Sequence, residues 1–231
     1  REELLAALGA CVFCTDGRLL PQVVGEMLRD RRMTFAAAES CTGGLLMARM
    51  TEVPGSSAWV LGGLVTYSND LKMRMLGVDP SILEAHGAVS EPTAAAMADG
   101  VHARTQANVC VAITGIAGPS GGSDAKPVGS VVIALRVDGH PLSVRTHLFP
   151  GARDIVRFQA TQTAMALPVA VEHVVIEKRD GLFATEHRRE PRIDARRIDR
   201  EVRGIEARRI EARRTAAVCV RGRPPPRPSP T

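Results

Sequence analysis

The sequence predicts a three-layer α/β/α sandwich built on a mixed sheet of about five strands. Two observations predict this class. Short apolar runs, typical of strands buried on both faces, alternate with segments of helical periodicity. Two further β-rich runs are then joined across Asp138-Gly139, a hairpin signal, so the sheet should contain antiparallel as well as parallel strands.

The elements follow one another in a regular order. Apolar residues at helical spacing predict the first helix, and proline suits its first turn. Serine or asparagine precedes several later helices as a candidate cap, and Gly62-Gly63 predicts a bulge or a close backbone approach within the second strand. We expect helices over 21–32, 45–50, 69–76, 81–85, 91–104 and 152–167, and strands over 33–38, 59–67, 109–114, 128–137 and 142–149.

Composition limits the class of protein. The 231 residues are enough for one domain with an enzyme-sized core, and 45% hydrophobic content is ordinary for a soluble protein. Only 3% of residues are aromatic, so we expect an aliphatic core and few stacking surfaces for single-stranded nucleic acid. No apolar run approaches the ~20 residues of a membrane span, and no signal peptide is recognisable. We therefore expect a cytoplasmic protein without membrane contact.

The sequence divides into three parts: an N-terminal extension (1–20), a folded domain (21–167) and an Arg/Pro-rich tail (168–231). The formal net charge of +5 comes from the tail. We expect the tail to be helical or largely disordered, and nucleic-acid contact, if any, to involve only this basic segment. The chain begins at Arg1 rather than Met, which leaves open whether the natural chain starts upstream.

Five cysteines form an odd, scattered set. Cys11 and Cys14 have C-x-x-C spacing, which alone could indicate a redox pair or half of a zinc site. No second pair follows, so two reduced cysteines are the preferred interpretation. No His/Cys/Asp/Glu cluster has metal-ligand spacing, and we expect a site without a metal or other cofactor.

The first candidate for chemistry is Glu39-Ser40-Cys41-Thr42-Gly43-Gly44, which joins a predicted strand to a predicted helix. A serine at such a junction, followed by two glycines, exposes a hydroxyl beside free backbone N–H groups that favour a phosphate or an oxyanion. An ordinary helix cap is the alternative interpretation.

Three more polar residues follow strands: Tyr67, Lys72 and Thr114. Because ligands bind at the carboxyl ends of strands in open α/β sheets, Ser40, Tyr67 and Thr114 should lie near one another. No histidine has a comparable place. Lys72 could be the base for Ser40 if burial keeps it neutral, and Tyr67 could relay the proton. An exposed helix lysine is the alternative.

A glycine-rich loop, 115–127, begins at Gly115 and carries Lys126, but it matches no dinucleotide or Walker pattern. It could still cradle a phosphate. Arg153, at the start of the last helix, is a second candidate for binding an anion. A flexible loop and a solvent-exposed arginine are the alternatives.

Several motifs together resemble the CinA C-terminal domain family: AAESCTGG (37–44), VPGSS (53–57), GGLVTYSNDLK (62–72), HGAVSEP (86–92), TGIAGPSGG (114–122), KPVG (126–129) and FPGARD (149–154). The resemblance covers roughly 21–167. It implies a nicotinamide-nucleotide amidase that converts nicotinamide mononucleotide to nicotinate mononucleotide and ammonia in pyridine-nucleotide salvage. It also implies a homo-oligomer, such as a dimer.

The resemblance also implies roles for individual residues. Ser40 is expected to be the nucleophile, Lys72 the base and Tyr67 the proton relay. Backbone N–H groups near Thr42, Gly43 and Gly44 are expected to hold the oxyanion. Ser57, Thr114 and Arg153 match further positions, with Ser57 also a reserve nucleophile. A non-catalytic nucleotide-binding module linked to competence or DNA damage is the alternative function.

Overall fold

A computed structural model describes residues 13, 14 and 16–179, which lie in one unit of the chain. Predictions for 1–12, 15 and 180–231, including most of the tail, lie outside the described residues. The elements in chain order are α2 (Leu20–Asp30), β1 (Phe35–Glu39), α3 (Leu45–Thr51), η2 (Ser56–Ala58), β2 (Val60–Val65), α4 (Asn69–Leu76), α5 (Pro80–His86), α6 (Glu91–Thr105), β3 (Val109–Gly115), β4 (Ser130–Val137), β5 (Ser143–Leu148) and α7 (Arg153–Arg179).

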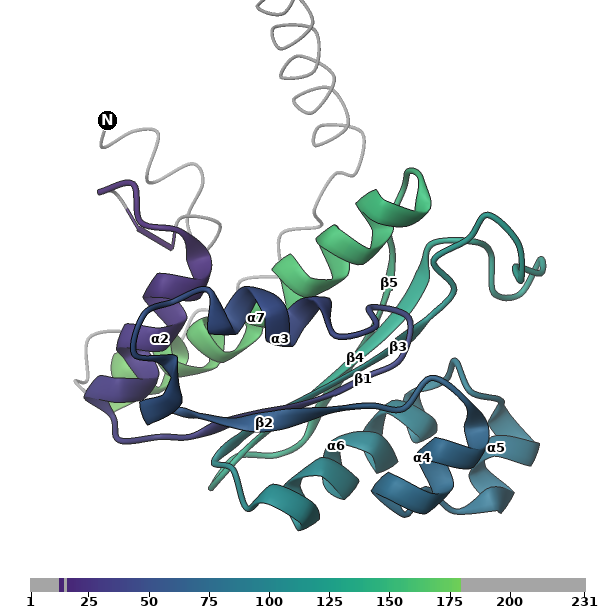
Figure 1. Ribbon diagram of the computed structural model, residues 1–231, viewed down its shortest axis with the longest axis horizontal. Helices are drawn as coiled ribbons and strands as arrows, with labels where there is room; N and C mark the ends of the chain where they lie inside the picture. Colours follow the sequence, from purple (N-terminus) through teal and green to yellow (C-terminus); the bar gives the residue numbers. More distant parts are fainter. Residues whose placement is uncertain (1–12, 15, 180–231) are drawn as a thin grey trace, which may run out of the picture. The chain divides into compact units, whose positions relative to one another are not determined.

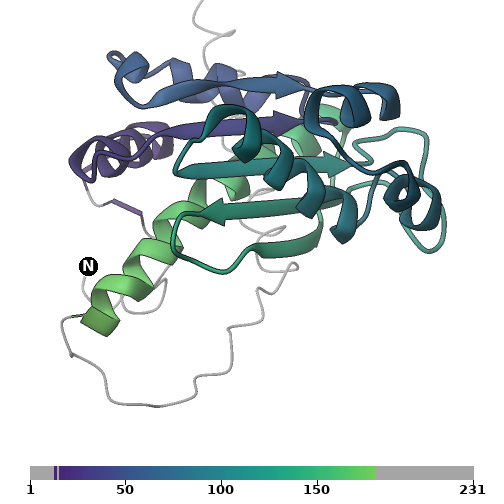
Figure 2. The ribbon, with the colours of Figure 1, turned by 90° about the horizontal axis from the view of Figure 1, so that it is seen from below.

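The sheet has five strands in the order β2-β1-β3-β4-β5. β1 pairs in parallel with β2 and β3, whereas β4 pairs antiparallel with β3 and β5. Figure 2 shows the arrowheads of the three parallel strands pointing to one end. The predicted mixed sheet and the hairpin at Asp138-Gly139 are both confirmed.

Helices cover both faces of the sheet. In Figure 1, α2, α3 and α7 lie on one face, and α4, α5 and α6 lie on the other. Each face has its own buried cluster, and both are mostly aliphatic: Phe35 and Trp59 are the only aromatic residues among the buried hydrophobic side chains described. The predicted three-layer sandwich with an aliphatic core is therefore confirmed.

Serine caps start α4 and α6, as the sequence predicted. The Ser68 hydroxyl accepts the Leu71 N–H at 3.2 Å at the start of α4, and Ser90 accepts the Thr93 N–H at 3.4 Å at the start of α6. Such caps satisfy N–H groups that have no partner within the helix. The first of them fixes the beginning of the helix that carries Lys72.

The region of the glycine pair in β2 contains both a bulge and a close approach between elements, the two features that the sequence suggested. The register of β2 against β1 shifts between Phe35 and Ala36, because Leu61 is an extra residue in β2. At Gly63, a Cβ would lie 2.4 Å from Cγ of Met47 in α3. Only glycine lets α3 pack this closely on β2, and α3 is the helix that follows Ser40.

The last helix differs from its predicted end at Leu167. α7 continues through Pro168 to Arg179. Proline disfavours a helix interior because it lacks an N–H and crowds the preceding turn. Here Ala164, Met165 and Val169 all belong to the buried core, and this packing carries the helix past the proline.

The described part of the chain excludes some structural features. None of its helices is long and apolar enough to cross a membrane. Within the same residues, no group of three or more His, Cys, Asp or Glu is placed to hold a metal ion. Cys14, Cys41 and Cys110 are free thiols.

Candidate active site

The candidate site lies at the carboxyl ends of the three parallel strands. Ser40 follows β1, and its N–H donates to the carbonyl of Ile113 in β3 at 2.9 Å. On the other side, the Thr66 N–H donates to the Glu39 carbonyl at 2.8 Å, which places the end of β2 beside Ser40. From β1 the chain turns toward β2, and from β3 it turns toward β4. This reversal makes the ends of β1 and β3 the topological switch point, where ligands bind in open α/β sheets.

Ser40 and Lys72 are in direct contact. The Lys72 ammonium, on α4, lies 3.1 Å from Oγ of Ser40. Ser40 is 8% exposed and Lys72 only 1% exposed, so the pair is shielded from bulk water while the serine still reaches the surface. The predicted pairing of these two residues is therefore present, and the exposed-lysine alternative is wrong.

The surroundings of Lys72 favour its neutral form. Its Nζ also donates to the carbonyls of Thr66 at 2.8 Å and Tyr67 at 3.3 Å. Burial lowers the pKa of Lys72, and the smaller influence of Cys41 acts the other way. Lys72 forms no ion pair with any residue in the described ranges. A neutral amine would keep two N–H groups on these carbonyls and direct its lone pair at the serine hydroxyl.

The neighbouring thiol does not compete as a nucleophile. Cys41 follows Ser40 directly and is 6% exposed. Burial raises its pKa to about 11. Since the thiolate is the reactive form of cysteine, Cys41 is inert near neutral pH.

The Tyr67 side chain contacts Arg153 and makes no hydrogen bond to Lys72 or Ser40 among the described residues. Its hydroxyl is 3.2 Å from Nη2 of Arg153, which donates to it, and the tyrosine is 60% exposed. Only the backbone carbonyl of Tyr67 contacts Lys72. Because Lys72 reaches Ser40 directly, no relay through the Tyr67 hydroxyl is needed. The tyrosine instead lies at the rim of the site.

The turn after Ser40 also differs from the expected oxyanion site. The Gly43 N–H donates to the Ser40 carbonyl at 3.1 Å, and the Gly44 N–H donates to the Glu39 carboxylate at 3.0 Å. Two of the three expected donors are therefore occupied. The backbone N–H groups of Cys41 and Thr42 have no acceptor among the described residues. The Thr42 hydroxyl is fully buried and has no hydrogen-bond partner in the described part of the chain.

Thr114, Gly115 and Lys126 organise the neighbouring loops. The Thr114 hydroxyl donates to the Ala88 carbonyl at 2.7 Å, and Nζ of Lys126 donates to the His86 carbonyl at 2.9 Å. At Gly115 a Cβ would lie 2.8 Å from the Ser130 carbonyl oxygen, so this residue packs tightly against β4. These three residues shape the wall of the site through contacts within the protein.

A cleft of about 630 Å³ lies beside the turn, at the N-terminus of α7. Arg153 and Arg157 line it, together with Asp154 and apolar residues that include Ala117 and Val128. Arg153 donates to the Gly118 carbonyl at 2.8 Å, and Arg157 donates to the Thr42 carbonyl at 2.7 Å. The buried Nε of Arg157 has no partner in the described part of the chain. Two cations at a helix N-terminus suit an anionic group.

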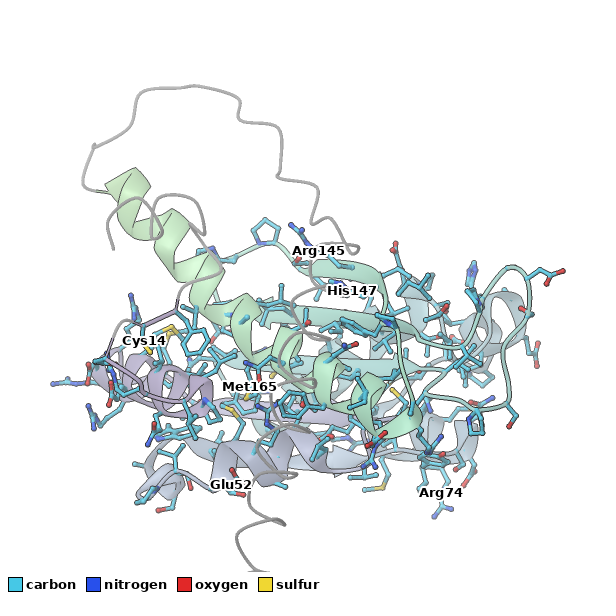
Figure 3. All side chains as sticks on the ribbon, turned by 90° about the horizontal axis from the view of Figure 1, so that it is seen from above. Cys14, Glu52, Arg74, Arg145, His147 and Met165 are labelled. Atoms are coloured by element: carbon cyan, nitrogen blue, oxygen red, sulfur yellow. The ribbon has the colours of Figure 1, made fainter. Side chains whose placement is uncertain are left out.

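Within a single copy of the chain, Ser57 lies away from this site. It lies in η2, before the first residue of β2, whereas Ser40 follows the last residue of β1. The two strands are parallel, with Val60 opposite Phe35 and Val65 opposite Glu39, so the serines lie at opposite ends of the sheet. At about 3.3 Å per residue, β1 separates them by on the order of 15 Å. In Figure 3, Glu52, which precedes this turn, and Arg74, on the helix of Lys72, also lie at opposite ends.

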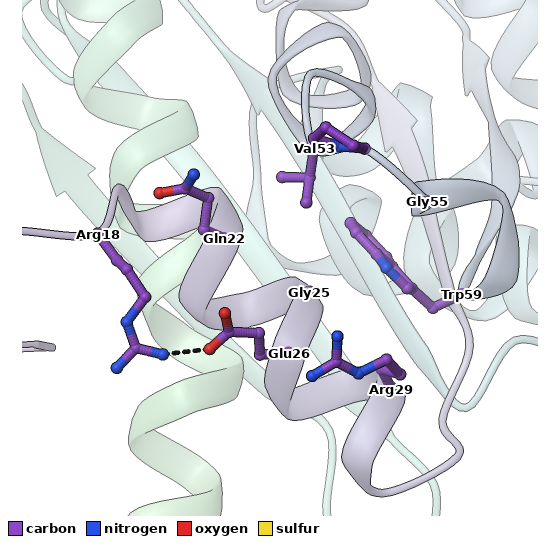
Figure 4. A pocket seen from close by; sticks show the side chains of 9 residues that line it. Arg18, Gln22, Gly25, Glu26, Arg29, Val53, Gly55 and Trp59 are labelled. Atoms are coloured by element: carbon purple, nitrogen blue, oxygen red, sulfur yellow. Dashed lines mark hydrogen bonds and ion pairs between the residues drawn. The ribbon is translucent and has the colours of Figure 1, made fainter.

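A second cavity, of about 250 Å³, lies near Ser57 and away from Ser40. Figure 4 shows it between α2 and the turn before β2, with Trp59 on one side and the Arg18–Glu26 ion pair on the other. Val53, Pro54 and Gly55 contribute to its lining. The VPGSS motif therefore builds this turn and its packing on α2.

Three features of the site were not anticipated. Glu39 occupies the start of α3, the Thr66 carbonyl holds Lys72, and Arg157 adds a second cation to the cleft. Arg157 could have been found, because it is four positions after Arg153 and shares its helix face. The Thr66 carbonyl could not have been found in this way, because every residue has a backbone carbonyl.

Comparison with known proteins gives one consistent family. The family model described as the CinA C-terminal domain matches residues 18–170. A putative competence-damage inducible protein of Moorella thermoacetica is 50% identical over 160 residues, which are 69% of this chain and 38% of that protein. A CinA-like protein of Mycobacterium marinum is 50% identical over 159 residues, or 69% and 37% of the two chains. The chain thus covers under two fifths of the length of these relatives.

Solved structures agree with this result. A competence/damage inducible protein of Agrobacterium tumefaciens is 37% identical with a TM-score of 0.63, covering 69% of this chain and 99% of that one. A CinA superfamily protein of Escherichia coli is 31% identical with a TM-score of 0.64, covering 71% and 98%. These structures share the α/β fold described above.

Proposed function

The chain belongs to the CinA C-terminal domain family, and we propose that it is a nicotinamide-nucleotide amidase. It would hydrolyse the carboxamide of nicotinamide mononucleotide to nicotinate mononucleotide and ammonia. The observation that carries the proposal is the buried contact between Lys72 Nζ and Ser40 Oγ, at 3.1 Å. It supplies a nucleophile and a base at the switch point of the sheet.

In the first half of the reaction, Ser40 Oγ attacks the amide carbon while its proton passes to neutral Lys72. The free N–H groups of Cys41 and Thr42 are the donors proposed for the oxyanion, in place of Gly43 and Gly44. The C–N bond then breaks, and the leaving nitrogen takes the proton from Lys72. Ammonia departs and an ester on Ser40 remains.

In the second half, water attacks this ester. Lys72 accepts a proton from the water and returns it to Ser40 Oγ as the C–O bond to the serine breaks. The product carboxylic acid ionises to nicotinate mononucleotide. Each proton taken by Lys72 is given back, so the pair is restored without a metal or other cofactor.

The nucleotide phosphate is proposed to bind in the cleft at the start of α7. Arg153 and Arg157 line the cleft, and its volume of about 630 Å³ is within the range of small-molecule sites, roughly 300–1,000 Å³. Ala117 and Val128 offer apolar surface for the rest of the ligand. Tyr67, held by Arg153, lies between this cleft and Lys72.

The test is release of ammonia from nicotinamide mononucleotide, compared with the riboside that lacks the phosphate. We expect turnover of the nucleotide and little of the riboside. Arg153→Ala should raise KM for the nucleotide by roughly 10-fold or more, since charge-assisted hydrogen bonds contribute about 1.5–3 kcal/mol. Equal use of both substrates by the wild type and by Arg153→Ala would contradict the phosphate assignment.

A second candidate function is a nucleotide-binding module without catalysis. The names of the relatives, which refer to competence and damage induction, favour keeping it. The same cleft would then bind the nucleotide and regulate a partner. Binding of nicotinamide mononucleotide by calorimetry, with no ammonia released by the folded wild type, would select this function over the amidase.

A further inference from the structure

Glu39 is a buried carboxylate directly beside the proposed nucleophile. It is the last residue of β1, immediately before Ser40, and it is 0% exposed. Its Oε2 accepts the N–H groups of Gly44 at 3.0 Å and Leu46 at 3.1 Å, and its Oε1 accepts the N–H of Met47 at 2.9 Å. No cationic side chain pairs with it in the described ranges.

These bonds place a negative charge at the positive end of α3. A helix begins with backbone N–H groups that have no partner in the helix, and together they attract an anion. Gly44, the residue before α3, has no side chain to cap them. Glu39 therefore satisfies them from across the turn and fixes the end of β1 to the start of α3.

The turn enclosed by these bonds is the segment from Ser40 to Gly43. The Gly43 N–H donates to the Ser40 carbonyl, which closes the turn on itself. The N–H groups of Cys41 and Thr42 are left without acceptors among the described residues. Without the carboxylate, the N–H groups of Gly44, Leu46 and Met47 would lose their acceptors, and the turn would lose its attachment to α3.

We infer that Glu39 is a positioning residue: it fixes the Ser40 turn so that the N–H groups of Cys41 and Thr42 face the reacting group. This inference rests on the proposed function. It distinguishes the start of α3 from the start of α7. The start of α3 is filled by the protein's own carboxylate, whereas the start of α7 remains open at the cleft.

Glu39→Gln is the informative variant. Glutamine keeps the size of the side chain but has one acceptor oxygen, and its NH₂ group would face backbone N–H groups instead of accepting from them. The turn would lose part of its anchoring without creating a cavity. The matched control is Met50→Ala, because Met50 is a buried residue of the same helix that makes no bond to Glu39.

The experiment uses the full chain and two readouts, taken at a temperature where all variants are folded. The first is kcat and KM for ammonia release from nicotinamide mononucleotide. The second is the rate at which a fluorophosphonate probe labels Ser40, measured by mass spectrometry, which does not depend on the natural substrate. We expect Glu39→Gln to lower kcat and the labelling rate by about 10²-fold or more, as for loss of an oxyanion donor, with KM changed by less than about threefold. Met50→Ala should lower Tm but leave kcat and labelling near wild type.

The outcomes separate this inference from the proposed function. If the wild type is labelled at Ser40 but releases no ammonia, the amidase proposal fails, and labelling of Glu39→Gln still decides the role of Glu39. Near-wild-type labelling of Glu39→Gln overturns the inference. So does an equal loss in Met50→Ala, which would show that any damage to α3 has the same effect. A wild type that is neither labelled nor active overturns both.

Discussion

At the scale of single residues, the proposed chemistry depends on one buried amine. Lys72 lies among two carbonyl oxygens and a serine hydroxyl, with no carboxylate bonded to it in the described part of the chain. Burial opposes a cation there and lowers the pKa of Lys72. The same burial that supports Lys72 as the proposed base also makes its protonated form unfavourable for the fold.

The lowered pKa of Lys72 predicts that both activity and stability rise with pH. Only neutral Lys72 accepts the serine proton, so kcat/KM should rise with pH through its lowered pKa and then level off. Across the window between this pKa and the ordinary lysine value, the unfolded chain binds more protons. The contribution of Lys72 to the free energy of unfolding should therefore rise with pH in that window. A pH–rate profile and denaturant unfolding at several pH values measure both effects.

Lys72→Met tests the same residue directly. Methionine removes the base, so turnover should fall by about 10⁴-fold or more, while Tm should be no lower than that of the wild type because a buried amine has been replaced by an apolar chain. Circular dichroism supplies the stability measurement. Residual activity with the wild-type pH profile would contradict the assignment of Lys72.

At the scale of elements, the site depends on how α4 is held. Its last residue, Leu76, is approached by Gly100 of α6 so closely that a Cβ would lie 2.1 Å from the Leu76 carbonyl oxygen. Backbone cannot move aside as a flexible side chain can. The position of Lys72 therefore depends on a glycine in a different helix.

For this reason Gly100→Ala should destabilise the protein, although alanine usually stabilises a helix relative to glycine. In an open helix, alanine in place of glycine gains about 1 kcal/mol, whereas here we expect a loss of about 1–3 kcal/mol from overpacking and a lower kcat as α4 shifts. Ala103→Gly is the control, since Ala103 is exposed on the same helix. It should cost about 1 kcal/mol and leave kcat unchanged. A more stable Gly100→Ala variant would show that the contact has no such effect.

The elements were largely predictable because local signals coincide with them. Apolar runs marked the strands, and Ser68 and Ser90 marked two helix starts. The continuation of α7 through Pro168 was not predictable, because the core contacts of Val169 and its neighbours outweigh a local signal against helix. The tail beyond 179, expected to be helical or largely disordered and to be the only segment with any nucleic-acid contact, stays a prediction.

The site was predictable in part for a similar reason. Ser40, Lys72 and Thr114 follow strands or begin a helix at the correct end, and topology then brings them together. Ser57 carries the same turn signal but precedes its strand, and a list of motifs does not show which end of a strand a turn occupies. The role of Glu39 required the path of the turn after it, since its partners are backbone N–H groups.

At the scale of the whole molecule, the family domain of this chain matches only part of its longer relatives. The matched part is 38% of the Moorella protein, so the biological setting stays a proposal together with the amidase. The expected dimer and the cytoplasmic location are also still predictions. Sedimentation of the purified chain tests the first of these directly.

A whole-molecule prediction concerns metal removal. The Ser40–Lys72 pair supplies both nucleophile and base, so the proposed reaction needs no metal ion. Preincubation with EDTA should leave ammonia release from nicotinamide mononucleotide unchanged. Activity that is lost with EDTA and restored by a divalent cation would contradict the proposed chemistry.

The central claim is that Ser40 is the nucleophile of an amidase. The most direct measurement compares ammonia release from nicotinamide mononucleotide by the wild type, Ser40→Ala and Ser57→Ala, each shown to be folded. The account predicts turnover by the wild type and, since Ser57 lies at the other end of the sheet, by Ser57→Ala within a few-fold. It predicts loss of about 10⁴-fold or more for Ser40→Ala. Full activity in Ser40→Ala, or loss only in Ser57→Ala, would contradict it.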